Sequence, residues 1–533
     1  MQLVRFSTGW ETVDNVDGRR QNVLHAWLLE DLKPNFFSGC TKLTRVDGAV
    51  KKIGKEAFSD CGLTTVNLPL ATKIGERAFK GCAGLTSADL PEATHIGGWA
   101  FSECGLISVN LPSVTRINHH AFHKCTRLKS IELPSVTRID KRTFYFCKSL
   151  TSVKLPSVTK IFQHAFHKCI SLKSIELPSV EIIYERAFVR CGLTSVDLPA
   201  TNIGNGAFIF CTHLISVNLP ATQIERGAFM GCTSLTSVDL PLATNIGKKA
   251  FESCALTSVN LPLVTHIEEE AFKGCNSLTS ADLPLATHIG KRAFWGCALT
   301  SVNLPKATEV GDIAFHGCPL TSIDLPLATH IAIMAFWECT GLKTVNLPSA
   351  TSISTGTFGS LDSECNLTLV NIPLVTIIEE DAFINCTLET VICFDTADIR
   401  GMSNMPKENK AKSVELSKIC KRIYDLTDKA VEWLDMRSRM RVAFRNVMTV
   451  DTITVNLPGW ATELQFANFT FYTFEQLRVK VSSLPEPVQQ IWKQYVNDKI
   501  RMYHVDITFL NQFKPGTMEG VNAFLNEPRR LRF

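Results

Sequence analysis

Apolar and polar residues recur along most of this chain in one fixed order, about every 21 residues. Residues 256–275 read LTSVNLPLVTHIEEEAFKGC, and residues 278–297 read LTSADLPLATHIGKRAFWGC. The general form is L-x-S-V-x-L-P-x-A/V-T-x-I-x-x-x-A-F-x-x-C, and residues 34–394 hold about 17 copies of it. One copy is too short to bury its own apolar side chains. The pattern therefore predicts a solenoid, in which stacked repeats bury them together.

Each repeat divides into a strand and a return arc. The segment L-x-S-V-x-L alternates as a short strand does, which places Val and the last Leu inward and the residues beside Val outward. Pro follows the strand and cannot donate a hydrogen bond to a neighbour, so pairing should end there. The arc should then return the chain with its Ile, Ala, Phe and Cys in the core. The Thr hydroxyl is expected to satisfy backbone groups at the turn.

The cysteines fall almost entirely at the last position of the repeat. The chain has 19 of them, and residues at one repeat position lie about 4.8 Å apart on neighbouring parallel strands with parallel side-chain directions. That geometry is poorly suited to a disulfide bond. The spacing also matches no zinc-binding pattern. We therefore predict a buried ladder of free thiols, which suits a reducing compartment.

The two ends of the chain lack the repeat. Residues 1–33 are predicted to cap the first repeat, with an amphipathic helix over residues 22–32. Residues 395–412 read as a polar linker. Residues 413–533 are predicted to form a small α+β domain or cap of unknown family, with helices over residues 413–447 and 486–502 and strands over residues 450–457 and 464–474.

The repeat resembles a known family. L-x-S-V-x-L matches the L-x-x-L-x-L core of leucine-rich repeats, and the Pro, Ile-Gly, Ala-Phe and final Cys look like the BspA-like (Treponema pallidum-type) class. This resemblance implies an α/β-type repeat solenoid, a right-handed curved leucine-rich-repeat solenoid with a concave parallel β-sheet, here followed by the small C-terminal α+β domain or cap. Members of this family are regarded as adhesins, surface antigens or protein-binding modules.

Composition and motifs argue against several other functions. The formal net charge of +4 on 533 residues is too small to indicate nucleic-acid binding. Residues 1–20 lack the apolar run of a secretory signal, and no apolar run is long enough to predict a membrane span. No phosphate-binding glycine loop, nucleophile elbow or zinc-protease motif occurs, so we expect neither an enzyme nor a cofactor. With the thiol ladder, this favours a cytoplasmic protein, the cell surface being the alternative.

The outward strand residues form the first candidate binding surface. They are mostly a Ser and an Asn or Asp, so this concave face should be polar and mildly acidic, with few aromatic side chains. It would suit a basic or polar partner, a protein or a glycan; the alternative is a solvated face that only keeps the solenoid soluble. The predicted contacts are Ser237, Asp239, Ser258, Asn260, Ser280, Asp282, Ser301, Asn303, Ser322 and Asp324.

A local excess of His, Lys and Arg forms the second candidate, a basic patch that would face an anion. Its alternative is ordinary surface charge. The histidines at the position after the repeat Thr, such as His266 and His288, have no carboxylate or thiolate at a fixed spacing, so no metal site is predicted. The patch residues are His120, His123, Lys124, Arg142, His164, His167 and Lys168.

Three hypotheses about function follow. The first is a non-enzymatic protein-interaction scaffold built on the solenoid. The second is a cell-surface adhesin or antigen of the BspA-like type. The third treats the repeats as a targeting arm for an unrecognised C-terminal functional domain. The sequence leaves the partner and the oligomeric state undetermined.

Overall fold

The computed structural model describes residues 2–360, 365–372, 374–386, 388, 390–393, 398–399, 465–466 and 469–470. The chain divides into two compact units, Met1–Pro319 and Leu320–Phe533. Each unit carries the stacked repeats. We refer to one repeat as a rung of the stack.

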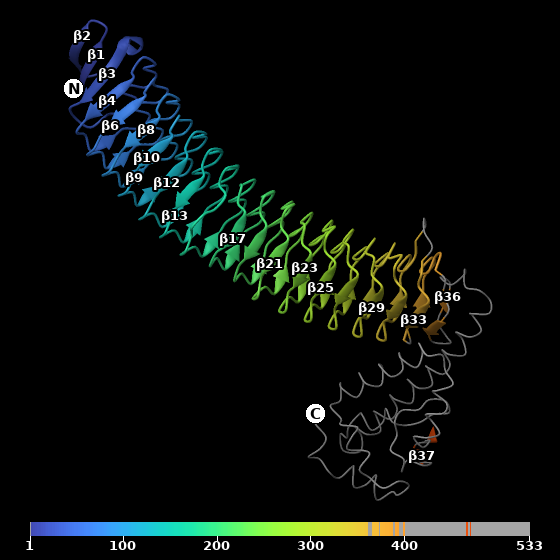
Figure 1. Cartoon of the computed structure of the whole chain (residues 1–533). Helices are drawn as coiled ribbons and strands as arrows, with labels where there is room; N and C mark the ends of the chain where they lie inside the picture. Colours follow the sequence, from blue (N-terminus) through green and yellow to red (C-terminus); the bar gives the residue numbers. More distant parts are fainter. Residues whose placement is uncertain are drawn as a thin grey trace, which may run out of the picture. The chain divides into compact units, whose positions relative to one another are not determined.

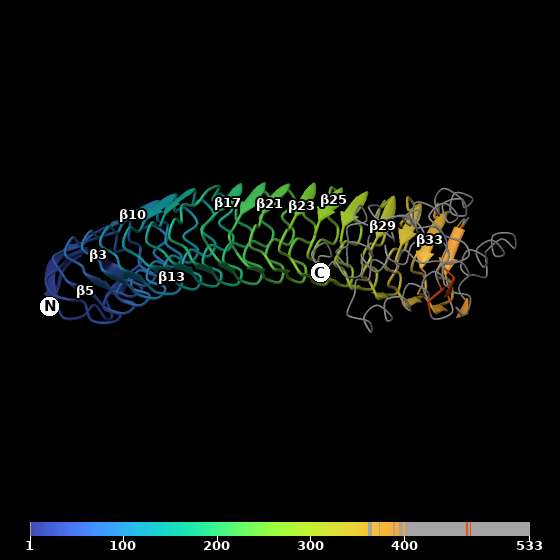
Figure 2. The ribbon, with the colours of Figure 1, turned by 90° about the horizontal axis from the view of Figure 1, so that it is seen from below.

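Two rows of short parallel strands run through the first unit, one on each side of the rungs (Figure 1). Figure 2 shows β10, β17, β21 and β23 of the first row along the upper edge, and β5 and β13 of the second row lower down. The first row consists of β4 (Arg45–Gly48), β6 (Thr65–Asn67), β8 (Ser87–Asp89), β10 (Ser108–Asn110), β12 (Ser130–Glu132), β14 (Ser152–Lys154), β17 (Ser195–Asp197), β19 (Ser216–Asn218), β21 (Ser237–Asp239), β23 (Ser258–Asn260), β25 (Ser280–Asp282) and β27 (Ser301–Asn303). The second row consists of β5 (Lys52–Ile53), β7 (Lys73–Ile74), β9 (His95–Ile96), β11 (Arg116–Ile117), β13 (Arg138–Ile139), β15 (Lys160–Ile161), β16 (Ile182–Ile183), β18 (Asn202–Ile203), β20 (Gln223–Ile224), β22 (Asn245–Ile246), β24 (His266–Ile267), β26 (His288–Ile289) and β28 (Glu309–Val310).

Equivalent repeat positions pair with one another in both rows. In the first row Ser258 lies opposite Ser280, and in the second row His266 lies opposite His288. The first row is interrupted, however, because β10 ends one sheet and β12 begins another, and β21 and β23 also belong to different sheets. The central Val of β10 and of β21 is partly exposed, whereas Val259 of β23 is buried. An interruption therefore opens a path to the apolar interior.

The arcs are not helical, so the α/β-type description is wrong for the described residues. Their one helical element is the 3-10 helix η1 (Arg20–Asn22). Each arc instead holds the second-row strand and a series of turns. Two residues in one arc have a positive φ, as at Glu270 (57°) and Gly274 (70°). An α-helix needs a negative φ at every residue, so this left-handed pair prevents one.

The helix predicted over residues 22–32 is also wrong. The chain there forms β3 (Val23–Leu28), which pairs antiparallel with β1 (Gln2–Phe6) and parallel with β4; β1 also pairs with β2 (Gly9–Val13). Val23, Ala26 and Leu28 are buried, while Trp27 is exposed. Pairing to the first rung's strand satisfies the backbone of this segment and outweighs its helical apolar spacing.

The core of each rung consists of the residue types predicted for it. Val259, Leu261, Ile267, Ala271 and Phe272 are all buried. The Phe rings of successive rungs stack in parallel: the Phe188–Phe208 and Phe208–Phe229 centroids are both 5.2 Å apart, with interplanar angles of 2° and 1°. One ring per rung thus forms an aromatic column that is continuous through the first unit from Phe37 to Phe315.

The Cys and Thr residues join neighbouring rungs. The prediction of free, buried thiols is confirmed for the register cysteines, which are all free and nearly all buried. Most of these thiols also donate a hydrogen bond to the Phe carbonyl of the preceding rung, as Cys275 does to Phe251 at 3.1 Å. The prediction for Thr is likewise confirmed, since the Thr287 hydroxyl donates to the backbone carbonyl of Thr265 at 3.1 Å.

The second unit repeats both rows and adds one short hairpin. The first row holds β29 (Ser322–Asp324), β31 (Thr344–Asn346), β33 (Leu369–Ile372) and β35 (Thr390–Cys393), and the second row holds β30 (His330–Ile331), β32 (Ser352–Ile353), β34 (Ile377–Ile378) and β36 (Asp398–Ile399). Pairing thus continues through Ile399. Within the range 464–474, predicted as a strand, the described residues form β37 (Gln465–Phe466) and β38 (Phe469–Thr470), which pair antiparallel with each other. The helices predicted over residues 413–447 and 486–502 and the strand over 450–457 lie outside the described residues.

Candidate interaction surfaces

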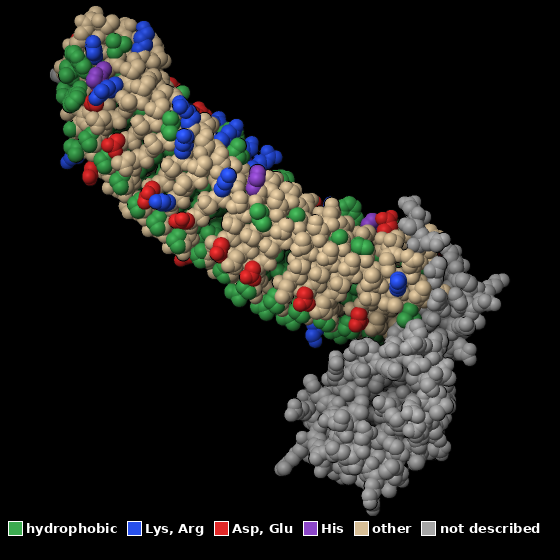
Figure 3. Space-filling view, in the orientation of Figure 1, with side chains coloured by type: hydrophobic (Ala, Val, Ile, Leu, Met, Phe, Trp, Pro, Cys, Tyr) green, Lys and Arg blue, Asp and Glu red, His purple; other side chains and the backbone are tan. Residues whose placement is uncertain are grey.

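The outward side chains of the first-row strands form one polar surface, which we call the strand face. On β23, Ser258 and Asn260 are exposed on either side of the buried Val259. Figure 3 looks onto this face and shows acidic side chains spaced along a mostly uncharged surface. The predicted contacts lie on β21, β23, β25 and β27 of the first unit and on β29 of the second, and all but the half-buried Ser280 are exposed. Whether they touch a partner stays a prediction.

Asn and Asp on neighbouring rungs of the strand face are bonded to each other. The Asn303 amide donates to Asp282 at 2.7 Å, and the Asn218 amide donates to Asp197 at 2.9 Å. The amide on one rung therefore compensates part of the carboxylate's charge on the preceding rung. Alternation of the two residue types consequently avoids repulsion between adjacent carboxylates and binds successive rungs together.

A row of exposed leucines borders the strand face, and we call it the leucine ledge. It comprises Leu242, Leu263 and Leu285, which occupy the position after Pro on three successive rungs and are 46%, 41% and 41% exposed. Each follows the outward Asp or Asn of its strand by three residues. Figure 3 shows apolar side chains along this lower edge, below the acidic ones. Exposed apolar residues in register form a patch, which is typical of protein-binding surfaces.

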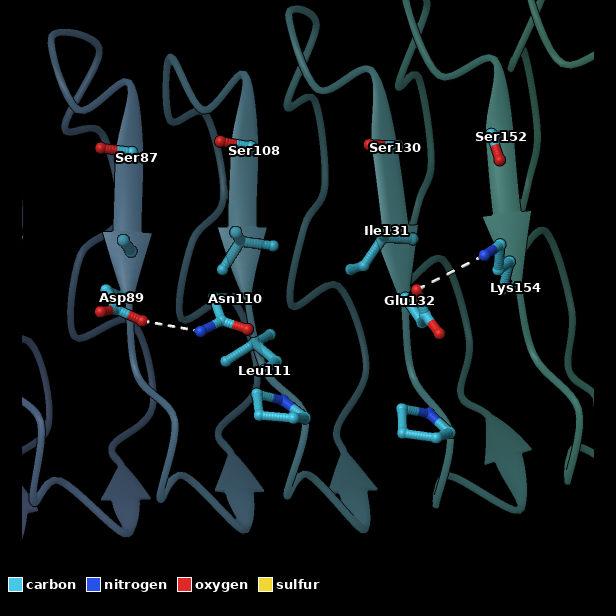
Figure 4. Close-up of a pocket in the computed structure, with 14 residues that line it drawn as sticks. Ser87, Asp89, Ser108, Asn110, Leu111, Ser130, Ile131, Glu132, Ser152 and Lys154 are labelled. Carbon is cyan, nitrogen blue, oxygen red and sulfur yellow. Dashed lines mark hydrogen bonds and ion pairs between the residues drawn. The ribbon is translucent and has the colours of Figure 1, made fainter.

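A hollow opens at the interruption between β10 and β12. Its volume is about 640 Å³, and its apolar lining includes Val109 and Ile131. Figure 4 shows the polar residues around it: Asp89 accepts a hydrogen bond from Asn110 at 2.8 Å, and Glu132 forms an ion pair with Lys154 at 3.7 Å. The hollow lies on the strand face but outside the predicted contacts. An apolar floor with carboxylates at its edge suits an aliphatic group that carries a positive charge.

A second surface forms where the arcs stack, and we call it the arc ladder. It consists of the side chains just before and after the Ala-Phe (in one rung Thr-Phe) pair, here Trp99, His120, His123, Arg142, Tyr145, His164 and His167. Within each arc, the residue before Ala and the residue after Phe lie close together. This is because the residue before Ala adopts a positive φ, as at His120 (59°) and His164 (57°). Five of the predicted basic-patch residues thus lie on one ladder, with Lys124 and Lys168 beside it.

The ladder histidines are largely shielded from water. His120 is only 7% exposed. Burial lowers the pKa of His120 and of His123 to about 4, and the neighbouring cations Arg142 and Lys124 add to the effect. Burial likewise lowers the pKa of His167 to about 4. These rings are therefore neutral at pH 7, where each can donate one hydrogen bond and accept another.

The histidines after the repeat Thr form a different array. The His266 and His288 rings stack at 4.7 Å, the Nδ1 of His266 bonds Thr265, and His288 lies 3.2 Å from Glu309. Throughout the described residues, no group of three or more His, Cys, Asp or Glu side chains is placed to hold a metal ion. None of these residues forms a helix long and apolar enough to cross a membrane.

The sequence did not reveal the leucine ledge, the hollow, or the parts that Trp99 and Tyr145 play in the arc ladder. Each ledge leucine stands at a repeat position whose residue varies, so only a comparison of successive rungs reveals the row. The same comparison at the residues flanking Ala-Phe would have exposed Trp99 and Tyr145. No signal in the sequence indicates the sheet interruption that opens the hollow.

Stacked rungs of a short strand and a return arc, with an apolar column inside, define a leucine-rich-repeat solenoid. The chain belongs to the BspA-type leucine-rich-repeat family. The family profile described as "BspA type Leucine rich repeat region (6 copies)" matches residues 27–116, 51–173, 94–214, 201–309 and 265–389. No curated protein matches the chain.

Solved structures of bacterial proteins are similar to this chain. A leucine-rich repeat protein from Bacteroides ovatus is 31% identical, with 53% of this chain and 84% of that chain covered and a TM-score of 0.44. The Treponema pallidum leucine-rich repeat protein is 30% identical over 36% of this chain and 77% of its own, with a TM-score of 0.27. A leucine-rich cell surface protein from Faecalibacterium prausnitzii is 22% identical over 72% and 86%, with a TM-score of 0.29.

Proposed function

We propose that this protein is a non-enzymatic scaffold that binds a protein partner through its strand face. The leucine ledge carries the proposal. Its three leucines remain more than 40% exposed although the fold buries nearly all other repeat leucines. The exposed part of an apolar row costs solubility and contributes nothing to folding, so a role in association accounts for it.

The residues beside the ledge define the partner's chemistry. Asp239 and Asp282 are exposed on the same rungs as Leu242 and Leu285. A partner segment with apolar side chains next to Lys or Arg would fit both rows. Each half-exposed leucine would gain on the order of 1 kcal/mol on burial, while the carboxylates would favour the orientation that brings basic side chains to them.

The hollow between β10 and β12 supplies a second contact for such a segment. Asp89 and Glu132 stand at its edge and Val109 and Ile131 at its floor. A Lys or Arg side chain has an aliphatic stem and a cationic end, which match the floor and the edge respectively. The hollow and the ledge thus favour the same class of partner.

The test is a comparison of captured proteins. The full chain is immobilised, incubated with a cell extract, and compared with a variant carrying Leu242→Ser, Leu263→Ser and Leu285→Ser. The control is Leu70→Ser, since Leu70 occupies the same repeat position and is 46% exposed but has Glu92 at the equivalent position of the next rung. We expect quantitative mass spectrometry to show one set of proteins retained by wild type and control and lost from the triple variant.

Charge reversal supplies the second arm of the test. Asp239→Lys and Asp282→Lys should weaken capture of the same proteins, because a basic segment would then meet like charges. Capture that is unchanged in both the leucine and the aspartate variants would refute a binding role for the strand face. Circular dichroism of every variant checks that the repeats remain folded.

A reducing compartment is part of the proposal. Its support is the ladder of free thiols, whereas the Faecalibacterium relative is described as a cell surface protein. Treating intact cells with a membrane-impermeant protease distinguishes the two locations. Protection of the protein until the cells are lysed supports the internal location, and cleavage on intact cells supports the surface.

A further inference from the structure

The arc ladder differs from rung to rung, unlike the strand face. The two ladder positions are the residue before and the residue after the Ala-Phe or Thr-Phe pair. On four successive rungs over residues 99–167, they hold Trp and Ser, His and His, Arg and Tyr, and His and His. The strand face repeats Ser with Asn, Asp or another charged residue over the same rungs. Aromatic and Arg side chains are the types that dominate binding energy at protein interfaces. Irregular placement of such side chains on an otherwise regular body distinguishes this surface from the rest of the first unit.

The ladder rings stack on one another. Trp99 and His120 lie parallel with centroids 3.9 Å apart. Tyr145 stacks on His123 at 5.2 Å and on His167 at 4.7 Å, so both of its faces are covered. Ring faces engaged in this way are not free to stack on a nucleobase or a sugar. The ring edges, which carry the polar nitrogen and hydroxyl groups, remain for recognition.

Several polar atoms within the ladder have no hydrogen-bond partner among the described residues. The Nδ1 atoms of His120, His164 and His167 and the Nε of Arg142 are buried and make no hydrogen bond with the described residues. A buried polar atom left unsatisfied costs about 1–3 kcal/mol. The four atoms lie on adjoining rungs, and a ligand that carries several oxygen atoms would reach them where these side chains turn outward on binding.

Two of the cations at the ladder have no ion-pair partner among the described residues. Arg142 and Lys168 have no carboxylate partner among the described residues and lie instead near the rings of Tyr145 and Phe146, at 5.7 Å and 5.1 Å. Arg190 on a following rung likewise lies against an aromatic ring, at 5.5 Å from the Phe210 centroid. The charges of Arg142 and Lys168 are therefore not neutralised by an ion pair within the described part of the chain.

A second basic cluster on the arcs provides the contrast. Lys249 lies 2.7 Å from Glu270 and 3.2 Å from Glu252, and Lys273 lies 3.2 Å from Glu270. Arg292 also approaches Glu270, at 3.6 Å. That cluster supplies its own counter-charges on neighbouring rungs. Beside the arc ladder, Lys124 has such a partner in Glu103 at 3.1 Å, but Arg142 and Lys168 have none among the described residues, so these two are suited to counter-charges from another molecule.

We propose that the arc ladder binds an acidic segment of a protein, whose carboxylates pair with Arg142 and Lys168 and accept hydrogen bonds from ring N–H groups of His120, His164 and His167. This rests on the proposed function of the chain as a protein-binding scaffold, and it adds a second surface with the opposite charge preference to the strand face. One solenoid thereby holds a basic segment on its strand face and an acidic segment on its arcs.

Protons are linked to this binding. His120 faces His119, His123, Lys141 and Arg142, all of which disfavour its charged form, and His167 faces His164, Lys168, Arg190 and Arg142. A bound carboxylate opposes these cations and stabilises the imidazolium form. Binding should therefore take up protons and become tighter as the pH falls from 7.5 to 5.5.

The experiment measures fluorescence anisotropy of a fluorescein-labelled poly-Glu peptide titrated with the full chain. We expect saturable, salt-sensitive binding that the Arg142→Glu, Lys168→Glu double variant weakens by about tenfold or more. The matched control is Lys42→Glu with Lys306→Glu, which makes the same change in net charge at exposed lysines off the ladder, and it should change affinity less than about twofold.

A conservative variant tests the ring edges. His120→Phe with His167→Phe keeps flat rings in the stack but removes the Nδ1 atoms, so it should weaken the peptide and abolish proton uptake, which calorimetry in two buffers of different ionisation enthalpy measures. The proposal is overturned if the control pair weakens peptide binding as much as the ladder variant does. It is also overturned if a single-stranded oligonucleotide or heparin of equal charge binds more tightly than poly-Glu. The capture experiment with the leucine variants is independent, so either surface can fail alone.

Discussion

The carbonyl oxygen of Phe208 accepts two hydrogen bonds, from the backbone N–H of Cys211 in its own rung and from the thiol of Cys232 in the next, both at 3.2 Å. The residue at the end of each repeat thus closes its own arc and joins it to the preceding one. A small apolar residue at this position would fill the space but could not make the second bond. This explains why the repeat ends in Cys.

Replacing Cys232 tests that bond. We expect Cys232→Ala to lower the free energy of unfolding by about 1–2 kcal/mol, because a buried carbonyl loses a donor and a small cavity forms. Cys232→Ser keeps a donor on a shorter arm, so it should cost less than the Ala change. Urea denaturation of the full chain measures both. A larger loss for Ser than for Ala would mean that the thiol only fills space.

The thiols should be unreactive until the chain unfolds. Burial raises the pKa of Cys125, Cys211 and Cys318 to about 12. Because these pKa values lie above that of a free thiol, the groups stay protonated at pH 7–9, and only the thiolate attacks thiol reagents. Ellman's reagent at pH 8 should therefore react slowly with Cys125, Cys211 and Cys318 in the native chain and at once in guanidinium chloride. Rapid labelling of these residues without denaturant would contradict the prediction.

The left-handed residues of the arcs make specific glycines important. Gly296 has a φ of 68°, and a Cβ built there meets no atom within 4 Å. Any cost of Gly296→Ala therefore comes from the backbone alone, and we expect a loss of about 1 kcal/mol. Gly296→Asn should cost less, since Asn tolerates this conformation. Chemical denaturation measures the difference; equal stability of Ala and Gly forms would contradict the strain argument.

Glu270 is the centre of the paired cluster on the arcs. Burial would by itself raise the pKa of Glu270, but hydrogen bonds from Lys249 and Lys273 lower it to about 2. A lowered carboxylate pKa stabilises the fold above the unfolded-state pKa near 4.3, and this contribution is lost as the pH falls through about 4 towards 2. We expect Glu270→Gln to cost about 3 kcal/mol at pH 7, since it leaves cations unpaired. Glu268→Gln, on an exposed residue of the same arc, is the control and should change stability by less than about 0.5 kcal/mol.

The repeat pattern predicted the interior because burial depends on residue type at a fixed period. Val259, Phe272 and Cys275 could be placed inside from one copy of the repeat. The arcs could not be predicted equally well. Glu270 gives no indication of a left-handed backbone, since Glu favours helices, and only the equivalent glycines on other rungs point to it. The helix prediction for residues 22–32 was wrong for a related reason. The pairing of β3 with β1 and β4 is a long-range contact, and local periodicity carries no information about it.

The candidate surfaces were predictable only as single residues. His120, His167 and Arg142 were recognised from local charge, but their stacking with Trp99 and Tyr145 depends on which arc positions are adjacent in space. The missing counter-charge on Lys168 was also not visible, because it depends on the distances to carboxylates on other rungs. Regular repeats make the fold easy to predict, and the partner must be inferred from the positions where the rungs differ.

The ladder histidines should make folding sensitive to pH. Their pKa values, about 4 for His120, His123 and His167, lie below that of an unfolded His near 6.5. Between these values the unfolded chain binds protons that the folded chain does not. The contribution of these histidines to the free energy of unfolding is therefore complete above pH 6.5 and is lost as the pH decreases towards 4.

Urea denaturation at several pH values from 7.5 to 4.5 measures this loss, which we expect to be on the order of 1–2 kcal/mol for each histidine at pH 4.5. His120→Phe with His167→Phe should flatten the profile, because the rings no longer titrate. His213→Phe, at an exposed histidine away from the ladder, should leave the profile as in wild type. If the double variant kept the full pH dependence, the loss would have to come from other groups, and the ladder histidines would not be the neutral, buried rings that their surroundings imply.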